Sequence, residues 1–256
     1  MLTLDVSMIS ECGGRDRNED ACGHWQSDTT LFCVLADGAG GHGGGQLASR
    51  LVVEHLLGAL ASGAPADGDG LERLVRSASQ AVAAARRQGT DSADMHATVV
   101  ALAVDFVARR ASWVHAGDSR LYRFRDRRMI ERTRDHSTVQ ALVDAGMLPE
   151  SQLREHPRRS ELRSALGVAE SALEVAHSGA PREVQPGDMF LLCSDGLWEH
   201  VPEPVLESTL DDAQTPDHWL QRLEHEVRER TLQRLRWDNF TALAVWAGDG
   251  RAALHR

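Results

Sequence analysis

Short apolar runs that end or begin beside an acidic residue do most to limit what this chain can fold into. Three such pairs are residues 31–36 before Asp37, residues 189–194 before Asp195, and residues 240–246 after Asp238. Apolar runs of this length between turn residues are typical of buried strands. Carboxylates at the ends of such strands would repel one another if they converged, unless a divalent cation lay between them. We therefore predict a metal site with hard oxygen ligands, which suit Mg²⁺ or Mn²⁺ better than zinc.

The charge of the chain excludes several functions. Its 256 residues carry a formal net charge of -10, and the isoelectric point is about 5.6. A nucleic-acid-binding protein would need a basic face to neutralise phosphates, so we expect no nucleic acid as a partner. All 28 basic residues are arginine, which rules out a P-loop lysine, a Schiff-base lysine and a kinase-type lysine. A chain this acidic that handled phosphate would need local cations, either metal ions or arginine.

The cysteines and the apolar runs indicate the cellular setting. Cys12, Cys22, Cys33 and Cys193 form no CxxC pair and no metal-ligand spacing, and the last two lie inside apolar runs as small buried hydrophobes. The N-terminus lacks the basic-then-apolar pattern of a signal peptide, and the longest apolar run, residues 97–104, is too short to span a membrane. We therefore expect a cytoplasmic protein with no membrane contact.

The order of the segments predicts an α+β fold. The predicted strands are residues 2–9, 31–36, 97–104, 111–116, 121–124, 190–194 and 240–246. The predicted helices are residues 46–60, 71–87, 139–145 and 217–232. This order is typical of stacked antiparallel sheets with helices outside. Residues 137–167 interrupt the strands with polar, helical sequence, so we predict an inserted subdomain there.

Two segments carry residues suited to phosphate chemistry. The glycines of Asp37-Gly38-Ala39-Gly40-Gly41-His42-Gly43-Gly44-Gly45 let the backbone approach a ligand, so a Gly carbonyl could itself bind a metal. The arginines of Arg15-Asp16-Arg17-Asn18-Glu19-Asp20 could hold a phosphate through paired hydrogen bonds. The alternatives are a flexible loop for the first segment and a solvated charged turn for the second. If the second is extended, Glu19 and Asp20 point in different directions, so only one of them can bind a given ion directly.

Six short motifs in a fixed order give the chain a family resemblance. They are Arg15-x-x-Asn18-Glu19-Asp20, Asp37-Gly38-x-Gly40-Gly41-His42, Gly117-Asp118-Ser119-Arg120, Asp135-His136-Ser137, Ser194-Asp195-Gly196-Leu197 and Asp238-Asn239-x-Thr241. With them the sequence resembles the bacterial metal-dependent Ser/Thr protein phosphatases of type 2C over nearly its whole length. The resemblance implies one catalytic domain over residues 1–256, built as a four-layer αββα sandwich. Two antiparallel β-sheets would be flanked by helices, with a mobile flap at about residues 137–167.

The resemblance also implies a role for each site residue. Asp37 would bridge two ions, either Mn²⁺ or Mg²⁺. Asp195 and Asp238 would complete the shell of the first ion, and Glu19 and the Gly38 carbonyl would hold the second. The remaining roles are a water-orienting Asp20, a phosphate-clamping Arg15, and a weaker third ion site formed by Asp118 with Asp195.

The implied activity is hydrolysis of phosphoserine and phosphothreonine in proteins by a water activated between the two ions, with no phosphoenzyme. The implied partners are phosphorylated proteins, among them a bacterial Ser/Thr kinase and its substrates, and the chain would act as a monomer. Two alternatives stay open: a catalytically inactive scaffold that binds phosphoproteins, and an enzyme that acts on small phosphoesters. The intact acids Glu19, Asp37, Asp195 and Asp238 argue against the scaffold.

Two further features distinguish this chain within the resemblance. Animal members carry a histidine two residues after the bridging aspartate as a proposed general acid, whereas this chain has Ala39 there, and His42 is the nearest candidate in sequence. The expected flap carries a local cationic cluster of His156, Arg158, Arg159 and Arg163. That cluster could steer an acidic, phosphorylated partner toward the site, or it could be a solvated surface.

Overall fold

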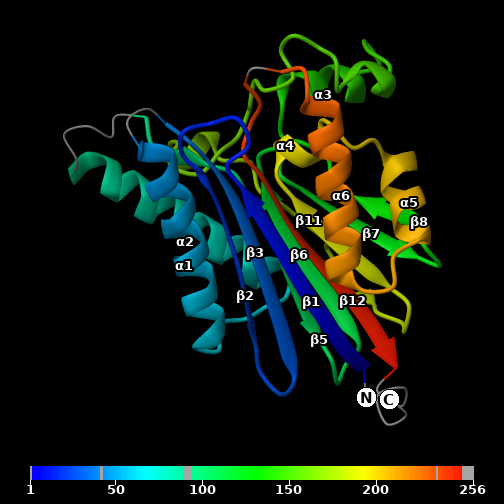
Figure 1. The fold of residues 1–256 in the computed structure, drawn as a ribbon. Coiled ribbons are helices and arrows are strands. Elements are labelled where there is room, and N and C mark those ends of the chain that lie inside the picture. The colour runs from blue at the N-terminus through cyan, green and yellow to red at the C-terminus, as the bar shows by residue number, and fades with distance from the viewer. Residues whose placement is uncertain (1, 41–42, 89–93, 235, 250–256) are drawn as a thin grey trace.

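The computed structural model describes residues 2–40, 43–88, 94–234 and 236–249. His42, the nearest candidate proton donor in sequence, lies outside these residues. Two sheets of antiparallel strands are stacked, and helices lie on both outer sides (Figure 1). This is the predicted four-layer sandwich.

The first sheet has five strands in the order β1-β12-β11-β7-β8. Their bounds are Leu2–Glu11 for β1, Phe240–Asp249 for β12, Met189–Cys193 for β11, Arg120–Arg125 for β7 and Arg128–Arg132 for β8. The second sheet follows the order β10-β6-β5-β3-β2, with β4 paired to β3 and β9 paired to β6. Its bounds are Arg182–Glu183 for β10, Arg110–Ala116 for β6, Val99–Asp105 for β5, Thr30–Ala39 for β3, Asp20–Gln26 for β2, His96–Ala97 for β4 and Ala176–His177 for β9.

Strand β3 shows why the central strands read as unbroken apolar runs. Successive side chains of a strand point to opposite faces of its sheet. Leu31 and Leu35 therefore face the other sheet, where they join the same cluster as Leu192 of β11. Phe32 and Val34 face the helices instead. Both faces are covered, so both sets of positions have to be apolar.

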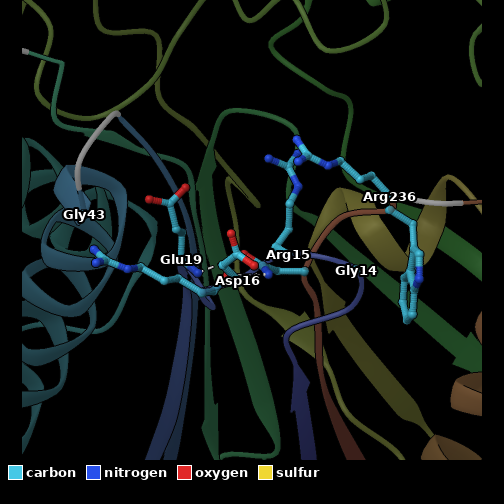
Figure 2. A pocket seen from close by; sticks show the side chains of 9 residues that line it. Gly14, Arg15, Asp16, Glu19, Gly43 and Arg236 are labelled. Carbon is cyan, nitrogen blue, oxygen red and sulfur yellow. Dashed lines mark hydrogen bonds between the residues drawn. The ribbon is translucent and has the colours of Figure 1, made fainter.

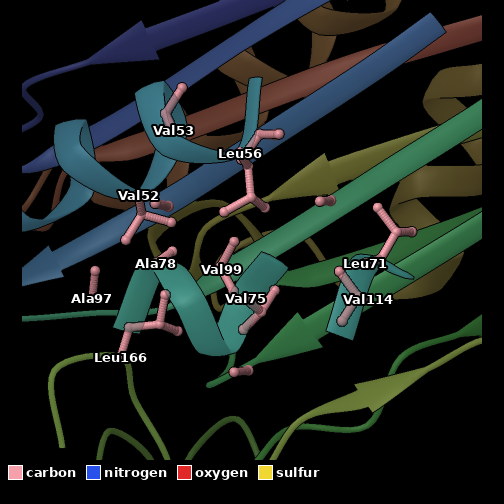
Figure 3. Packing of buried hydrophobic residues seen from close by; sticks show 14 of the residues in the cluster. Val52, Val53, Leu56, Leu71, Val75, Ala78, Ala97, Val99, Val114 and Leu166 are labelled. Carbon is pink, nitrogen blue, oxygen red and sulfur yellow. The ribbon is translucent and has the colours of Figure 1, made fainter. Parts of the chain in front are cut away.

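Helices α1 (Gly44–Ala61) and α2 (Gly68–Gln88) cover the second sheet. Val52 and Leu56 of α1 pack with Val75 of α2 over the strands, as Figure 3 shows. The first sheet is covered by α4 (Asp195–Trp198), α5 (Glu203–Asp211) and α6 (Pro216–Thr231). The start of α6 is fixed by Thr215, whose hydroxyl accepts a hydrogen bond from the His218 amide at 3.1 Å.

The segment predicted as a flap leaves the first sheet after β8 and returns to the second. It begins with α3 (Thr138–Asp144), capped by the Ser137 hydroxyl, and continues through a short 3₁₀ turn at Glu150–Gln152. Isolated bridges pair Ser137 with Leu162 and Ala97 with Leu166. The first bridge joins the two ends of the segment to each other, and the second attaches its C-terminal end to β4.

Several elements were not predicted from the sequence, namely β2, β8, β9, β10, α4 and α5. At residues 117–119 the chain crosses from one sheet to the other, because β6 and β7 belong to different sheets. None of the described helices combines the length and apolar character needed to cross a membrane.

Candidate active site

A cleft of about 380 Å³ opens at the edge where the two sheets meet the flap. Seven of the eight predicted site residues line it: Arg15, Glu19, Asp37, Gly38, Asp118, Asp195 and Asp238. They come from segments spread across the chain, and the fold brings them together. The eighth, Asp20, is buried beside the cleft, opposite Asp37 in the register of β2 and β3.

The position of Asp37 is fixed by its backbone. Its amide donates to the Thr98 hydroxyl at 3.0 Å, and its carbonyl accepts from the Thr98 amide at 2.8 Å. The next residue has to be glycine, because a Cβ on Gly38 would stand 2.1 Å from the Gly45 carbonyl oxygen. That close approach lets α1 begin directly beside the site, which is why the glycine-rich segment follows Asp37.

The buried carboxylates lack enough positive charge nearby. Burial raises the pKa of Asp20 to about 6, with a further contribution from Asp238, although the Ser194 hydroxyl donates to its Oδ2 at 2.8 Å. Burial also raises the pKa of Asp37 well above its usual range, and Asp20 and Asp195 add to that rise. The Oδ1 atom of Asp20 has no hydrogen-bond partner among the described residues. Buried acids that lie close together without a positive partner favour the binding of a cation between them.

Asp118 and Asp195 also line the cleft. Burial raises the pKa of Asp118 to about 7, assisted by Asp135 and opposed by Arg120. The Trp198 indole donates to the Asp118 carbonyl at 2.9 Å, which ties this loop to α4. Asp195 begins α4, and burial followed by the charge of Asp118 raises its pKa well above the usual range.

Asp238 is held by the predicted phosphate clamp. The Arg15 guanidinium lies 2.7 Å from Asp238 Oδ2, while the backbone N–H of Asn239 donates to Asp238 Oδ1 at 2.9 Å. Both carboxylate oxygens are thereby engaged. Within the described residues, no group of three or more His, Cys, Asp or Glu side chains forms a ready-made ion site. The donor set is nevertheless entirely oxygen and short of counter-charge, so its chemistry fits a hard divalent cation once Asp238 is released from Arg15.

Asn239 was quoted in a motif but given no role in the sequence analysis. Its side chain donates to the carbonyls of Cys12 and Arg17 at 2.8 and 2.9 Å, and it accepts from the Glu19 amide at 2.8 Å. One amide side chain therefore anchors both ends of the loop that carries Arg15. The Asp238-Asn239 motif could have suggested this role, because an amide next to a ligand often holds a neighbouring loop.

His96 also lines the cleft and was missed in the sequence analysis. It is the register partner of Ala39 in the β3–β4 pair, and its Nδ1 lies 3.3 Å from the Leu166 carbonyl. Directly opposite residues of an antiparallel pair project to the same face. His96 of β4 therefore lies beside Ala39, the position at which animal members carry the proposed proton donor. Nothing in the sequence around His96 indicated this, because strand pairing alone creates the juxtaposition.

Of the two alternatives for the cationic cluster of the flap, the ion pairs disfavour steering of an acidic partner. Each of its three arginines lies 2.7 Å from a carboxylate, in the pairs Arg158–Glu161, Arg159–Glu199 and Arg163–Glu174. The positive charges are therefore largely offset where they stand. Arg159 instead connects the flap to Glu199, which directly follows α4.

Comparison with known proteins identifies the family. The sequence profile described as Protein phosphatase 2C matches residues 13–236, and this chain belongs to that family. The serine/threonine protein phosphatase PstP of Mycobacterium tuberculosis (strain H37Rv) is 36% identical over 215 residues, which cover 83% of this chain but 39% of that protein. The match thus spans about two fifths of the mycobacterial relative. The serine/threonine phosphatase stp of Listeria monocytogenes (serovar 1/2a, strain EGD-e) is 31% identical over 207 residues, covering 78% of this chain and 80% of that protein.

Solved structures share the fold over nearly the whole chain. The catalytic domain of PstP in complex with 2 manganese ions aligns with a TM-score of 0.81 at 30% identity, covering 97% of this chain and 100% of that one. PppA, described as a key regulatory component of the type VI secretion system in Pseudomonas aeruginosa, aligns with a TM-score of 0.73 at 33% identity, covering 95% and 97%. These matches agree with the four-layer fold predicted from the sequence.

Proposed function

We propose that this chain is a Mn²⁺- or Mg²⁺-dependent phosphatase of phosphoserine and phosphothreonine in proteins. The observation that carries the proposal is the convergence of the predicted acids on one cleft beside an arginine. Membership of the Protein phosphatase 2C family and the manganese in the PstP catalytic domain support it. Among the alternatives, an inactive scaffold would have no need for buried carboxylates that depend on a cation for charge balance.

The proposed ligand roles are those that the family resemblance implies for the residues of the cleft. Asp37, which feels the charges of Asp20, Asp195 and Asp118, would bind both ions. Asp195 and Asp238 would hold the first ion, and Glu19 with the Gly38 carbonyl would hold the second. A weaker third site is assigned to Asp118 with Asp195. When bound, the two ions supply positive charge for phosphate oxygens and a water that ionises near neutral pH.

The side chains of the chain itself bind the substrate and manage protons. Arg15, which is about half exposed, exchanges its contact with Asp238 for the substrate phosphate and donates two parallel hydrogen bonds to it. Asp20, held by Ser194, accepts a hydrogen bond from the attacking water and so orients it. We assign no cysteine nucleophile, because none of the four cysteines lines the cleft. Cys33 and Cys193 are also fully buried, and burial raises the pKa of both thiols.

The proposal also covers the setting of the enzyme. We assign residues 1–256 to one catalytic domain with a flap at about residues 137–167, acting as a cytoplasmic monomer against a bacterial Ser/Thr kinase and its substrates. The four cysteines are free, which suits a reducing compartment. Light scattering of the purified protein would test the monomer, and phosphoproteome comparison of a strain lacking the chain would test the opposition to a kinase.

The direct test is release of phosphate from phosphothreonine and phosphoserine peptides with Mn²⁺, with Mg²⁺ and with EDTA, beside a panel of phosphorylated metabolites. The proposal expects metal-dependent turnover of the peptides with a higher kcat/KM than any metabolite. Turnover of metabolites alone would favour a small-phosphoester phosphatase. Peptide binding without turnover at saturating Mn²⁺ would favour the scaffold.

A further inference from the structure

A wide surface groove lies next to the acidic cleft rather than within it. This groove has a volume of about 820 Å³ and is lined by Gly14, Arg15, Asp16, Arg17, Glu19, Gly43, Arg236, Trp237 and Asn239. Arg15, Glu19 and Asn239 line both the groove and the cleft. A substrate phosphate held by Arg15 would therefore leave the neighbouring residues of the same peptide over the groove.

Three guanidinium groups border this groove on an otherwise acidic protein. Figure 2 shows the Arg15 and Arg236 side chains reaching toward each other above it, with Gly43 on the far side. Arg17 extends toward Gly43, because its Nη1 lies 3.0 Å from where a Cβ on that glycine would be. Of the three groups, Arg15 alone pairs with a carboxylate in the described part of the chain, that of Asp238. Two arginines therefore remain available for a ligand.

The backbone that carries these arginines is firmly held. The Gly14 amide donates to the Trp237 carbonyl at 3.0 Å, and a Cβ on Gly13 would stand 2.1 Å from the Asp238 carbonyl oxygen. Residues 13 and 14 thus bring the arginine loop against the segment that carries Arg236. The Trp237 ring stacks on Phe240 with centroids 5.6 Å apart and forms an apolar wall. The groove therefore combines a backbone held by these contacts with arginine side chains along its border.

The carboxylates that face the groove are those of Asp16 and Glu19. Glu19 is assigned above to the second ion, which would offset its charge. Asp16 remains, against the two arginines that have no described partner. The local balance is therefore positive beside the phosphate position, whereas the whole chain has a formal net charge of -10. Such a local reversal of sign selects anionic groups on a ligand.

We infer that this groove receives acidic or further phosphorylated residues next to the phosphoserine or phosphothreonine, with Arg17 and Arg236 as the recognising groups. The inference rests on the proposed function, since it places the flanking residues relative to a phosphate at Arg15. Selection of acidic peptides by charge would then depend on the loop before β2 and the segment before β12. The flap arginines do not provide it, because each is paired with a carboxylate.

The test uses two synthetic phosphothreonine peptides that differ only in the residues on either side, glutamate in one and glutamine in the other. For each protein, kcat/KM is measured with saturating Mn²⁺ at low and at high salt. Binding is measured separately by anisotropy at saturating Mn²⁺, with fluorescently labelled peptides that carry a non-hydrolysable phosphonate in place of the phosphate. The quantity compared throughout is the ratio of the glutamate peptide to the glutamine peptide.

We expect a ratio of about 5 to 20 in the unaltered protein at low salt, which corresponds to two exposed charge contacts. The ratio should approach one in the double variant Arg17→Ala with Arg236→Ala, and it should fall below one with Arg17→Glu and Arg236→Glu. The double variant Arg17→Lys with Arg236→Lys should keep most of the preference, since charge rather than shape is at work. Higher salt should lower the ratio. Arg73→Ala, an exposed arginine of α2, is the matched control and should leave the ratio unchanged.

An unaltered ratio in the Ala double variant, or a ratio of one or less in the unaltered protein, would overturn the inference while leaving the proposed function in place. The two failures are distinguishable because the binding ratio is obtained without turnover. If the unaltered protein hydrolyses neither peptide, the proposed function is wrong, and the anisotropy ratio still decides whether the groove selects acidic peptides.

Discussion

Asp20 and Asp37 stand directly opposite each other in the antiparallel pair of β2 and β3. Residues in this relationship have their Cβ atoms about 4.5–5.5 Å apart, a separation at which like charges destabilise a sheet. The hydroxyl of Ser194 stabilises one oxygen of Asp20, but its other oxygen has no described partner. The sheet therefore holds two carboxylates together at a cost in stability that a bound cation would remove.

The first prediction concerns this cost. Without metal, Asp20→Asn should raise the free energy of unfolding by about 1 kcal/mol, because it removes a like charge opposite Asp37. With saturating Mn²⁺ the variant should gain less stability than the unaltered protein. Urea unfolding in EDTA and in Mn²⁺ measures both effects. A metal-free variant that is clearly less stable than the unaltered protein would mean that the pair is not strained.

The second prediction concerns the two neighbouring arginines of the flap. Arg159 pairs with Glu199 beside α4, whereas Arg158 pairs within the flap with Glu161. Arg159→Ala should therefore lower kcat/KM several-fold for a phosphopeptide and equally for a small aryl phosphate, since it loosens the flap over the cleft. Arg158→Ala, the matched control, should change neither. A loss confined to the phosphopeptide and reduced by salt would restore the steering role that the ion pairs disfavour.

The third prediction assigns proton donation to His96, which stands beside Ala39 in the cleft. The alkoxide of serine or threonine needs a proton to leave, whereas p-nitrophenolate leaves unaided. His96→Ala should therefore lower kcat for a phosphothreonine peptide by about 100-fold and change that for p-nitrophenyl phosphate little. The control is His24→Ala, an exposed histidine of β2. Equal losses on the two substrates would remove His96 from proton transfer.

The fourth prediction uses Glu203, which lies 2.7 Å from Arg154 and 3.0 Å from Arg132. Burial opposes its ionisation, but Arg154 and then Arg120 hold its pKa down to about 2, below the ordinary value of 4.5. The ionised group therefore stabilises the fold above pH 4.5, and this contribution is lost as the pH falls toward 2.

Glu203→Gln should consequently cost about 2–3 kcal/mol at pH 7 and about 1 kcal/mol less at pH 4. Urea unfolding at the two pH values measures the difference. Glu155→Gln, which changes an exposed glutamate of the flap, should show no such pH dependence. A cost for Glu203→Gln that is the same at both pH values would show that the arginines do not depress its pKa.

The sequence predicted best those strands that are buried on both faces. β3, β5, β11 and β12 are continuous apolar runs because neighbours cover each side. β2 and β8 are edge strands with mixed burial, and their polar residues gave no clear period. Propensity alone does not identify such strands, because pairing to a neighbour determines them.

The acids of the site were predictable because strand ends fix their positions, but their contacts were not. The pairing of Arg15 with Asp238 joins residues 223 positions apart. The pairing of Arg159 with Glu199 also joins residues far apart in the chain, and it offsets one charge of the cationic cluster. His96 lies in the cleft because β4 pairs with β3 in a register that places it opposite Ala39. Contacts of this kind depend on the folded arrangement and have no local signal.

The central claim is that Asp37 organises the metals on which hydrolysis depends. The most direct measurement is Asp37→Asn, followed by calorimetric titration with Mn²⁺, phosphopeptide turnover at saturating Mn²⁺, and urea unfolding to verify the fold. Our account predicts that the variant unfolds cooperatively, loses both high-affinity Mn²⁺ sites of the unaltered protein, and has no Mn²⁺-dependent turnover. A folded variant that retains about a tenth or more of the unaltered kcat would contradict the account. Loss of the charge on an acid that binds both metals should lower kcat by more than that.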